Sequence, residues 1–408
     1  MKLFFLLLAI AVSAHGYPLD GAARTGIRRL IGYRGKKLPP GAMRTSDEIR
    51  LRLQGANDSY DLDSRTPRDS YLQAGIERIF GPRDVSYSVA LLDVTDPAHP
   101  AYASLRADEK KIPGSVGKLM VATGLFGAVA QTYPDPAARE RLLRDTVVTA
   151  DSFVYRDGKT VPFFDEGDAA VTNRRVEAGD KFNLWEWADH MLSQSSNAAG
   201  STVWKQTMLI RRFGASYPAS KEDESAFFKS TPKPELGRLS LEALETPLKA
   251  AGIDTGRLRL GTFFTRNASA VVPGTGSYAC PNELLRWLIK MEQGKLVDPW
   301  SSLELKRLLY FVRPRYRYAS SPALNNAAVF FKSGSLFECE AEPGYKCLQY
   351  KGNKVNLMHS VAVVESGTKT YLIAMMSNVL RINSAVEHQT IAGEIEKLIQ
   401  SRPAAAND

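Results

Sequence analysis

Residues 111–122, KIPGSVGKLMVA, decide the fold that we predict. Pro113 and Gly114 are typical of a loop, and from Ser115 onward apolar residues recur at helical spacing, which predicts a helix. Ser115 and Lys118 lie three positions apart, so on a helix their side chains share one face and can meet. A lysine held against an apolar helix face is poorly solvated, so it can lose its charge and act as a base for the hydroxyl. This Ser-x-x-Lys pattern is that of an acylating serine.

The same spacing occurs a second time, at Ser230 and Lys233, so it is not specific by itself. Pro232 lies inside this second pair and is hard to place in a helix interior. For the first pair, the alternative is a helix cap at Ser115 followed by a lysine whose stem lies along the helix surface. The rest of the chain decides between these interpretations.

Two further short motifs occur once each. Ser195 and Asn197 form a Ser-x-Asn on the connection between predicted helices at residues 183–194 and 198–208, where a hydroxyl and an amide can point into a cleft. The alternative for this motif is helix capping. The second motif, residues 332–334 (KSG), ends a predicted apolar strand, where a cation and a hydroxyl could hold an anionic substrate along the strand edge. Its alternative is a solvated strand end.

The three motifs, in this order and on these elements, resemble the signature of the serine β-lactamases and penicillin-binding proteins. The resemblance covers residues 85–399 and is greatest to the class A β-lactamase type of domain. It implies an α/β (α+β) fold in which helices flank an antiparallel sheet on both faces and an all-helical lobe is added. The site would lie between the sheet and the lobe.

The resemblance also implies roles for the residues on the helical side of the site. Ser115 would be the nucleophile and Lys118 its base. Ser195 would relay a proton to the departing nitrogen, and Asn197 would bind the amide side chain of the substrate. For Lys118 to be neutral near pH 7, its pKa must fall by about 3 units. We expect Lys332 to cause part of that fall as a neighbouring like charge.

The residues on the strand side would hold the other end of the substrate. Lys332 and Ser333 would bind its carboxylate, and Gly334 would let it lie close along the strand. The backbone N–H groups of Ser115 and Ser335 would form the oxyanion hole, which is usually the largest single catalytic contribution.

One part of the family pattern is missing. Class A β-lactamases carry a glutamate, in a Glu-x-x-Leu-Asn setting, that activates the water for deacylation. The corresponding loop here, residues 265–269 (TRNAS), contains no acid. Glu235 is a possible substitute from the preceding segment. Without such a carboxylate, acylation is expected, whereas fast hydrolysis of the acyl-enzyme is not.

Four functions are compatible with these residues. The first is a D-alanyl-peptidase-like serine hydrolase that forms an acyl-enzyme with β-lactams or acyl-D-Ala-D-Ala amides and releases it slowly. The second is a true class A-type β-lactamase with another water activator. The third is an esterase or amidase, and the last is a non-catalytic cell-wall-binding relative. The missing glutamate favours the first over the second, and the three intact motifs disfavour the last.

Composition and the first residues indicate a secreted globular protein. The chain has 408 residues, of which 44% are hydrophobic and 24% charged. Residues 1–16 match a signal peptide, with a basic start, an apolar centre too short to span a bilayer and small residues before the cut. We therefore expect a secreted or periplasmic protein without a stable membrane span. We place an N-terminal extension at residues 17–73 and the hydrolase domain at residues 74–402.

Charge and cysteine content exclude some classes of partner. The net charge is +9, but basic and acidic residues are interleaved and no basic-aromatic stripe occurs, so nucleic acid is not expected as a partner. The expected substrate is a small molecule or a peptidoglycan peptide. No cofactor is expected, and no His, Cys or Asp cluster has metal-ligand spacing. Cys339 and Cys347 could form a local disulfide in an oxidising compartment or remain reduced, and Cys280 is expected to be buried.

The pattern of the compact part predicts a hairpin, a helical middle, three closing strands and a terminal helix. Strands are expected at residues 85–94, 101–105, 328–331, 358–364 and 370–376. Further helices are expected at residues 71–80, 240–251, 281–292, 301–312 and 385–400. Residues 134–180 are interpreted as loop-rich, residues 217–234 as a surface insertion and residues 261–279 as a loop.

Overall fold

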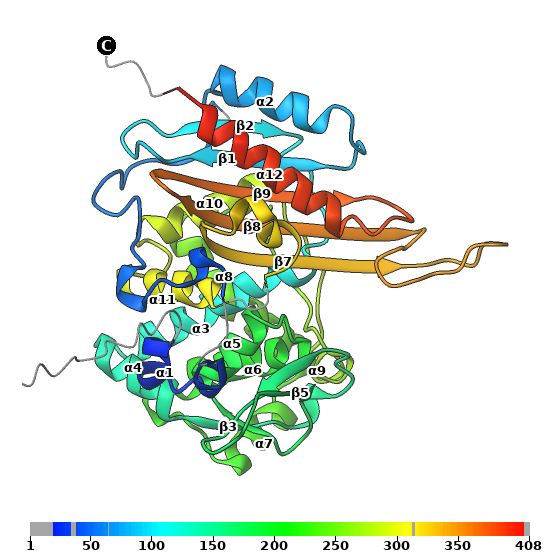
Figure 1. The fold of residues 1–408 in the computed structure, drawn as a ribbon. Coiled ribbons are helices and arrows are strands. Elements are labelled where there is room, and N and C mark those ends of the chain that lie inside the picture. The colour runs from blue at the N-terminus through cyan, green and yellow to red at the C-terminus, as the bar shows by residue number, and fades with distance from the viewer. Residues whose placement is uncertain (1–18, 34–37, 64, 312–314, 404–408) are drawn as a thin grey trace, which may run out of the picture.

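A computed structural model describes residues 19–33, 38–63, 65–311 and 315–403 (Figure 1). The predicted signal peptide, residues 1–16, lies outside the described residues. Within the described ranges, none of the helices is both long and apolar enough to cross a membrane.

The central element is a five-stranded sheet in the order β2-β1-β9-β8-β7, in which every neighbouring pair is antiparallel (Figure 1). The hairpin strands predicted before the Ser115 helix therefore join the three closing strands, although more than 200 residues separate them. The strands are β1 (Ser88–Asp93), β2 (Ala101–Leu105), β7 (Ala328–Glu338), β8 (Val355–Ser366) and β9 (Lys369–Asn378).

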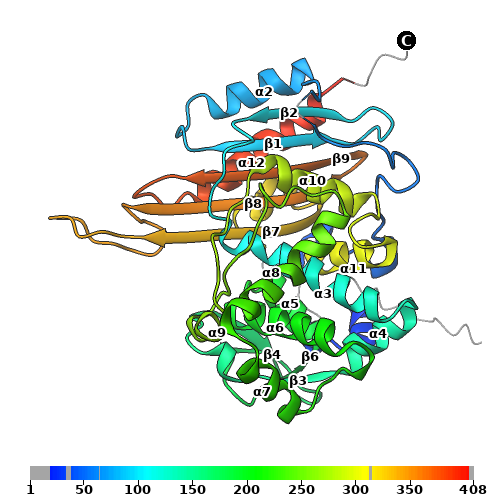
Figure 2. The same ribbon diagram turned by 180° about the vertical axis from the view of Figure 1, so that it is seen from behind.

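Both faces of this sheet are covered, as predicted. All six residues of β1 are buried; Val89 and Leu91 pack into one apolar core, and Ala90 and Leu92 pack into the other. The first core lies under α2 (Ser70–Phe80) and α12 (Ala385–Ser401). The second lies under α10 (Pro281–Glu292) and α11 (Pro299–Tyr310), on the opposite face (Figure 2). A strand buried on both sides explains the continuous apolar run in the sequence.

The second core continues into a helical lobe beneath the sheet (Figures 1 and 2). Its helices and small strands are α1 (Leu19–Thr25), α3 (Lys118–Thr132), α4 (Pro136–Asp145), α5 (Leu184–Leu192), α6 (Asn197–Phe213), α7 (Lys221–Ser230), α8 (Lys233–Ala250), α9 (Arg266–Val271), β3 (Val147–Thr149), β4 (Thr160–Phe163), β5 (Thr172–Arg175) and β6 (Lys181–Asn183). The fold class is therefore the predicted one.

Three segments contain more regular structure than predicted. Residues 134–180 include α4 and three short strands, residues 217–234 include α7, and residues 261–279 include α9. The prediction missed α7 because most of its side chains are polar or exposed, so it lacks a wide apolar stripe. Asp135 caps α4, accepting hydrogen bonds from the backbone N–H groups of Ala137 and Ala138. Asp followed by Pro is a helix-start signal that could have been recognised.

Strand β7 is also longer than predicted, because residues 332–334 continue it rather than end it. Because Gly334 has no side chain, the strand can run close beside the turn that precedes α3. A Cβ atom at Gly334 would lie 2.6 Å from the carbonyl oxygen of Pro113, and one at Gly114, whose φ is +51°, would lie 3.1 Å from that of Ser335. The two glycines therefore allow β7 to pack against the start of α3.

Residues 19–33, the first described part of the segment interpreted as an extension, contribute directly to the core of the lobe. Ile27 and Leu30 are fully buried in it. Arg29 lies between them, is 2% exposed, and forms a bidentate ion pair with Asp189 of α5, which is 0% exposed. Arg29 also donates to the carbonyl oxygen of Phe311, 2.6 Å away. This segment is thus fixed to the lobe by apolar contacts and by a buried ion pair.

We predict that Asp189→Asn lowers the free energy of unfolding by about 3 kcal/mol, because it leaves the Arg29 cation buried without its counter-charge. Urea unfolding followed by circular dichroism measures this loss. Glu235→Gln is the matched control, since it breaks the exposed pair with Arg238 and should cost less than about 1 kcal/mol. Equal losses in the two variants would contradict the proposed contribution of the buried pair.

Candidate active site

Ser115 and Lys118 lie side by side at the start of α3. Ser115 belongs to a 3-10 turn, Gly114–Gly117, and Lys118 begins the α-helix. The expectation of one continuous α-helical face is therefore corrected, but the consequence is the same, because side chains at i and i+3 eclipse each other in a 3-10 turn. The Nζ of Lys118 lies 2.9 Å from the Oγ of Ser115. Ser115 is 8% exposed and Lys118 is 0% exposed, so only the serine reaches the cleft.

The surroundings of the Lys118 amine fix its orientation. It donates to the backbone carbonyl oxygen of Ser195 at 3.1 Å and to the Oδ1 of Asn197 at 2.7 Å. A neutral amine has two N–H bonds and one lone pair. Since both carbonyl oxygens can only accept, they engage the two N–H bonds and leave the lone pair directed at the Ser115 hydroxyl. The arrangement can therefore take a proton from that hydroxyl.

Burial is the main reason that the pKa of Lys118 lies well below its usual value. The next cause is the like charge of Lys159, while Asp157 opposes the shift. Lys159 is thus a neighbouring like charge that the sequence did not predict, whereas the expected repulsion between Lys118 and Lys332 appears in the lowered pKa of Lys332. The pKa of Lys332 is itself lowered by burial, and next by the charge of Lys118.

Ser195 lies on the tight connection between α5 and α6 in a strained conformation. Its φ is +58°, in the left-handed region that non-glycine residues rarely adopt. Two hydrogen bonds stabilise this conformation. Lys118 donates to the carbonyl oxygen of Ser195, and the Nζ of Lys332 donates to the Oγ of Ser195 at 2.9 Å. The Ser195 hydroxyl therefore bridges the lobe and the sheet.

The strand side of the site comes from β7. Lys332 and Ser333 are buried, and the Nζ of Lys332 also donates to the carbonyl oxygen of Ser333 at 2.8 Å. Arg317, from the preceding 3-10 turn Arg317–Ser320, donates to the carbonyl oxygen of Gly334 at 2.8 Å. Ser335 follows, and its backbone lies against Gly114 and so next to Ser115. The structure thus brings the three sequence motifs together.

These groups face a cleft of about 610 Å³ between the sheet and the lobe. Ser115, Ser195, Ser333 and Ser335 all line it. Its other described lining residues are Lys159, Gln194, Arg315, Tyr316, Arg317, Ser320, Tyr350, Asn383, Ala385 and Gln389. The cleft is large enough for a small molecule or the end of a peptide.

Asp157 is a central residue that the sequence reasoning missed. Its Oδ2 accepts hydrogen bonds from the Ser196 hydroxyl at 2.8 Å and from the backbone N–H groups of Asn197 and Ala198 at 2.6 and 2.8 Å. Its Oδ1 accepts from the backbone N–H of Lys159 at 3.1 Å. A carboxylate at the start of α6 also suits the helix dipole. Asp157 therefore positions both the Ser-x-Asn connection and Lys159, a role that no local motif reveals.

Asp157, the carboxylate that acts on Lys118, already accepts four hydrogen bonds, and the segment expected to carry the missing glutamate brings no acid to the amine. The ring of Phe264 lies over the amine, with its centroid 4.2 Å from Nζ, and Thr265 begins the turn into α9. Glu235, our possible substitute, is wrong, because its carboxylate pairs with Arg238 on the exposed side of α8 and does not line the cleft. The amine is therefore flanked on this side by an aromatic ring rather than by a carboxylate.

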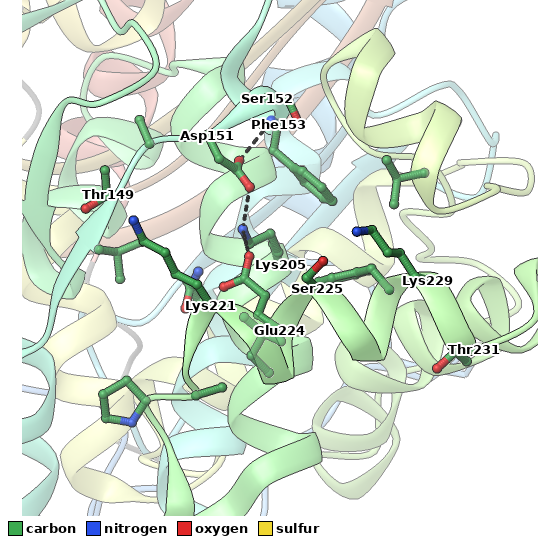
Figure 3. Close-up of a pocket in the computed structure, with 18 of the residues that line it drawn as sticks. Thr149, Asp151, Ser152, Phe153, Lys205, Lys221, Glu224, Ser225, Lys229 and Thr231 are labelled. Carbon is green, nitrogen blue, oxygen red and sulfur yellow. Dashed lines mark hydrogen bonds and ion pairs between the residues drawn. The ribbon is translucent and has the colours of Figure 1, made fainter.

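The second Ser-x-x-Lys pair lies at a different and larger cavity of the lobe. This cavity of about 1030 Å³ lies among η5 (Ser152–Val154), α6 and α7, and its buried Lys205 is neutralised by Asp151 and Glu224 (Figure 3). Ser230 ends α7 and Lys233 begins α8; both are exposed, and Lys233 donates instead to the carbonyl oxygen of Ala270. The lysine is therefore solvated, and this pair lacks the burial that activates Lys118.

The described histidines form no competing catalytic group. The Nε2–H of His359 donates to the carbonyl oxygen of Ile112 at 2.9 Å, and burial lowers the pKa of His359 to about 4. His388 contacts the hydroxyl of Ser360 at 2.9 Å, but both residues are fully buried between the sheet and α12. No His, Cys, Asp and Glu group in the described ranges has the arrangement of a metal site.

The cysteines adopt one of the two states that the sequence left open. Cys339 and Cys347 form a disulfide, and Cys280 is a buried free thiol. The disulfide closes the loop after β7, beyond the cleft. It is therefore a structural element and contributes no group to the site.

Comparison with known proteins gives matches in structure only. No family model matches the chain, and no curated protein matches it. A variant of PBP-A, solved as an acyl-enzyme complex with penicillin-G, is 13% identical with a TM-score of 0.51, covering 82% of this chain and 98% of that one. A beta-lactamase from Sphaerobacter thermophilus is 13% identical with a TM-score of 0.51, covering 81% and 95%. One from Desulfarculus baarsii is 15% identical with a TM-score of 0.51, covering 82% and 100%.

At these identities the likeness shows the fold. The chain has the serine β-lactamase and penicillin-binding-protein type of fold that its motifs resemble. The shared architecture extends over about four-fifths of the chain, since 81–82% of it is covered.

We predict opposite changes in the pKa of Lys118 from two substitutions. Lys159→Gln removes a like charge and should raise the pKa, whereas Asp157→Asn removes an attractive charge and should lower it. NMR titration of the lysine ε-carbon measures both. Lys397→Gln, an equal charge change at an exposed position of α12, is the control and should leave the pKa unchanged. Shifts of the same sign in the first two variants would refute this electrostatic account.

Proposed function

We propose that this protein is a penicillin-recognising serine hydrolase that forms an acyl-enzyme through Ser115. The observation that carries the proposal is the fully buried Lys118 amine, 2.9 Å from the Ser115 hydroxyl with carbonyl oxygens at its two N–H bonds. The fold of the structural neighbours supports it. The predicted signal peptide and disulfide suit a secreted or periplasmic enzyme that acts on peptidoglycan peptides.

In the proposed acylation, Lys118 takes the proton of Ser115 as its Oγ attacks the substrate carbonyl. The new C–O bond forms, the carbonyl oxygen gains negative charge, and the N–H groups of Ser115 and Ser335 stabilise it. The C–N bond then breaks. Ser195 delivers its hydroxyl proton to the departing nitrogen and regains one from the Lys332 ammonium, which donates a hydrogen bond to its Oγ, while Lys118 keeps the proton of Ser115. In a β-lactam the nitrogen stays attached through the opened ring; in an acyl-D-Ala-D-Ala amide, D-alanine leaves.

The two ends of the substrate have separate partners in this proposal. Lys332 and Ser333 bind its carboxylate. A bound carboxylate favours the charged form of Lys332, which compensates the lowering of its pKa by burial. Asn197 keeps its Oδ1 on Lys118, so its amide nitrogen is the group that binds the acylamino carbonyl. Gly334 allows the substrate to lie against β7.

We assign slow deacylation to this enzyme, as in a D-alanyl peptidase, because Phe264 occupies the place beside Lys118. Hydrolysis of the acyl-enzyme needs a positioned base for water. The alternative, a true β-lactamase, requires such a base from the substrate or from a rearranged loop. A non-catalytic wall-binding protein is disfavoured, since binding alone does not require a buried lysine beside a serine.

We predict that Ser115→Ala abolishes a penicilloyl adduct that forms on the wild-type protein. Lys118→Met should slow its formation by about 10²- to 10⁴-fold, the usual contribution of a general base. Intact-protein mass spectrometry after incubation with benzylpenicillin measures both. Ser230→Ala, at the second Ser-x-x-Lys pair, is the matched control and should be acylated like the wild type. An adduct that persists in Ser115→Ala would disprove the assignment.

We further predict that Phe264→Glu shortens the lifetime of the adduct, because it places a carboxylate beside Lys118 and admits water. The time course of adduct loss after removal of free penicillin measures the lifetime. Phe264→Leu, which keeps the position apolar, is the control and should retain a persistent adduct. If the wild-type adduct disappeared within seconds, the alternative of a true β-lactamase would replace slow deacylation.

A further inference from the structure

The cleft is strongly cationic. Lys159, Arg315 and Arg317 line it, and no acidic residue is found among the lining residues that the structure describes. Lys332 lies directly behind this surface and contacts the hydroxyl of Ser195. Such an excess of positive charge attracts and orients anions. A single carboxylate on the substrate would leave most of this charge uncompensated.

Asp157, the acid that interacts with these cations, is already engaged. Its carboxylate accepts four hydrogen bonds, from Lys159, Ser196, Asn197 and Ala198. The one from Lys159 comes from the backbone N–H, so the Lys159 ammonium is not neutralised by direct contact. Asp157 therefore organises the wall of the cleft rather than cancelling its charge.

The Lys159 ammonium differs from the other cations of the cleft. Lys332 and Arg317 each donate to oxygen atoms of the protein. With the described part of the chain, the Lys159 ammonium forms neither a hydrogen bond nor an ion pair, although the residue is only partly exposed and lines the cleft with Ser115. It is thus a cation available to a ligand.

The position of Lys159 indicates which end of a ligand it would meet. Lys332 and Arg317 come from the sheet side, whereas Lys159 comes from the lobe, immediately before β4. Asp157 holds the backbone N–H groups of both Lys159 and Asn197. The backbone of Lys159 is therefore tied to that of Asn197, the proposed partner of the acylamino group, and on this ground we place Lys159 beside the acyl end of the substrate.

We propose that the cleft selects dianionic substrates, with one carboxylate bound by Lys332 and Ser333 and a second, on the acyl side, bound by Lys159. This inference rests on the proposed function and adds the substrate class. The preferred substrates are then acylated amino acids or peptides that carry an acidic group near the scissile carbonyl, in addition to the terminal carboxylate. Lys159 is a specificity-determining residue in this account.

Two penicillins test the proposal. Carbenicillin differs from benzylpenicillin by one added carboxylate on the side-chain carbon next to the amide. We expect the wild-type protein at pH 7 to be acylated by carbenicillin at least about fivefold faster, the effect of one partly exposed ion pair. Lys159→Gln should abolish this preference, and Lys159→Arg should retain it. The ratio of the two rates cancels any change in the pKa of Lys118, because that change affects both penicillins.

Lys397→Gln is the control for total charge and should keep the wild-type ratio. The preference of the wild-type protein should also shrink at high salt, because ions screen the pair. Acylation by both penicillins at equal rates, or a preference that Lys159→Gln leaves intact, would overturn the dianion proposal while leaving the acylating serine in place. The absence of an adduct with either penicillin would instead overturn the proposed function, and this inference with it.

Discussion

The structure depends on the burial of one amine. Lys118 is placed at 0% exposure among apolar residues of the lobe, where an ammonium ion would be poorly solvated. Its three hydrogen-bonding partners come from two places in the chain: Ser115 in the turn before α3, and Ser195 and Asn197 between α5 and α6. These partners meet only if the turn before α3 and the connection between α5 and α6 are held close together. The strained backbone of Ser195 and the capping of α6 by Asp157 are consequences of that requirement.

The same constraint explains why the sheet and the lobe meet where they do. Strand β7 can approach the turn before α3 only because Gly114 and Gly334 leave room for backbone contact. That approach brings Lys332 to the hydroxyl of Ser195. Two buried lysines this close repel each other, which costs stability, but the proposed mechanism uses one as a neutral base and the other as an anion-binding cation in a single cleft. Lys159 extends this cationic wall toward the lobe.

The sequence was informative where a chemically reactive residue lay in a short motif on a predicted helix or strand. Ser115, Lys118, Ser195 and Lys332 could be found because short motifs fell on predicted elements, and the alternation of β1 between two cores accounts for its apolar run. The sequence could not reveal Asp157, because three of its four hydrogen-bonding partners are about forty residues away and its own segment has no periodicity.

The sequence also could not show that the charge of Lys159 acts on Lys118, because that effect depends on how close the two side chains lie in the fold. Glu235 illustrates the opposite error, because an acid near the right place in the chain points to solvent in the fold. The prediction missed helix α7 for a simpler reason. The apolar face that α7 turns toward the lobe is narrow, and Phe227 is buried by contacts with distant parts of the fold, which the local sequence does not show.

The most direct test of the account is the pH dependence of adduct formation at Ser115 in the wild-type protein. If Lys118 is the base and its pKa is well below 10.5, the rate should rise at acidic pH and become constant well before pH 10. Peptide mapping should place the penicilloyl group on Ser115 throughout. A rate that climbs tenfold for each pH unit up to pH 10 would show an ordinary, charged lysine and would contradict the central claim.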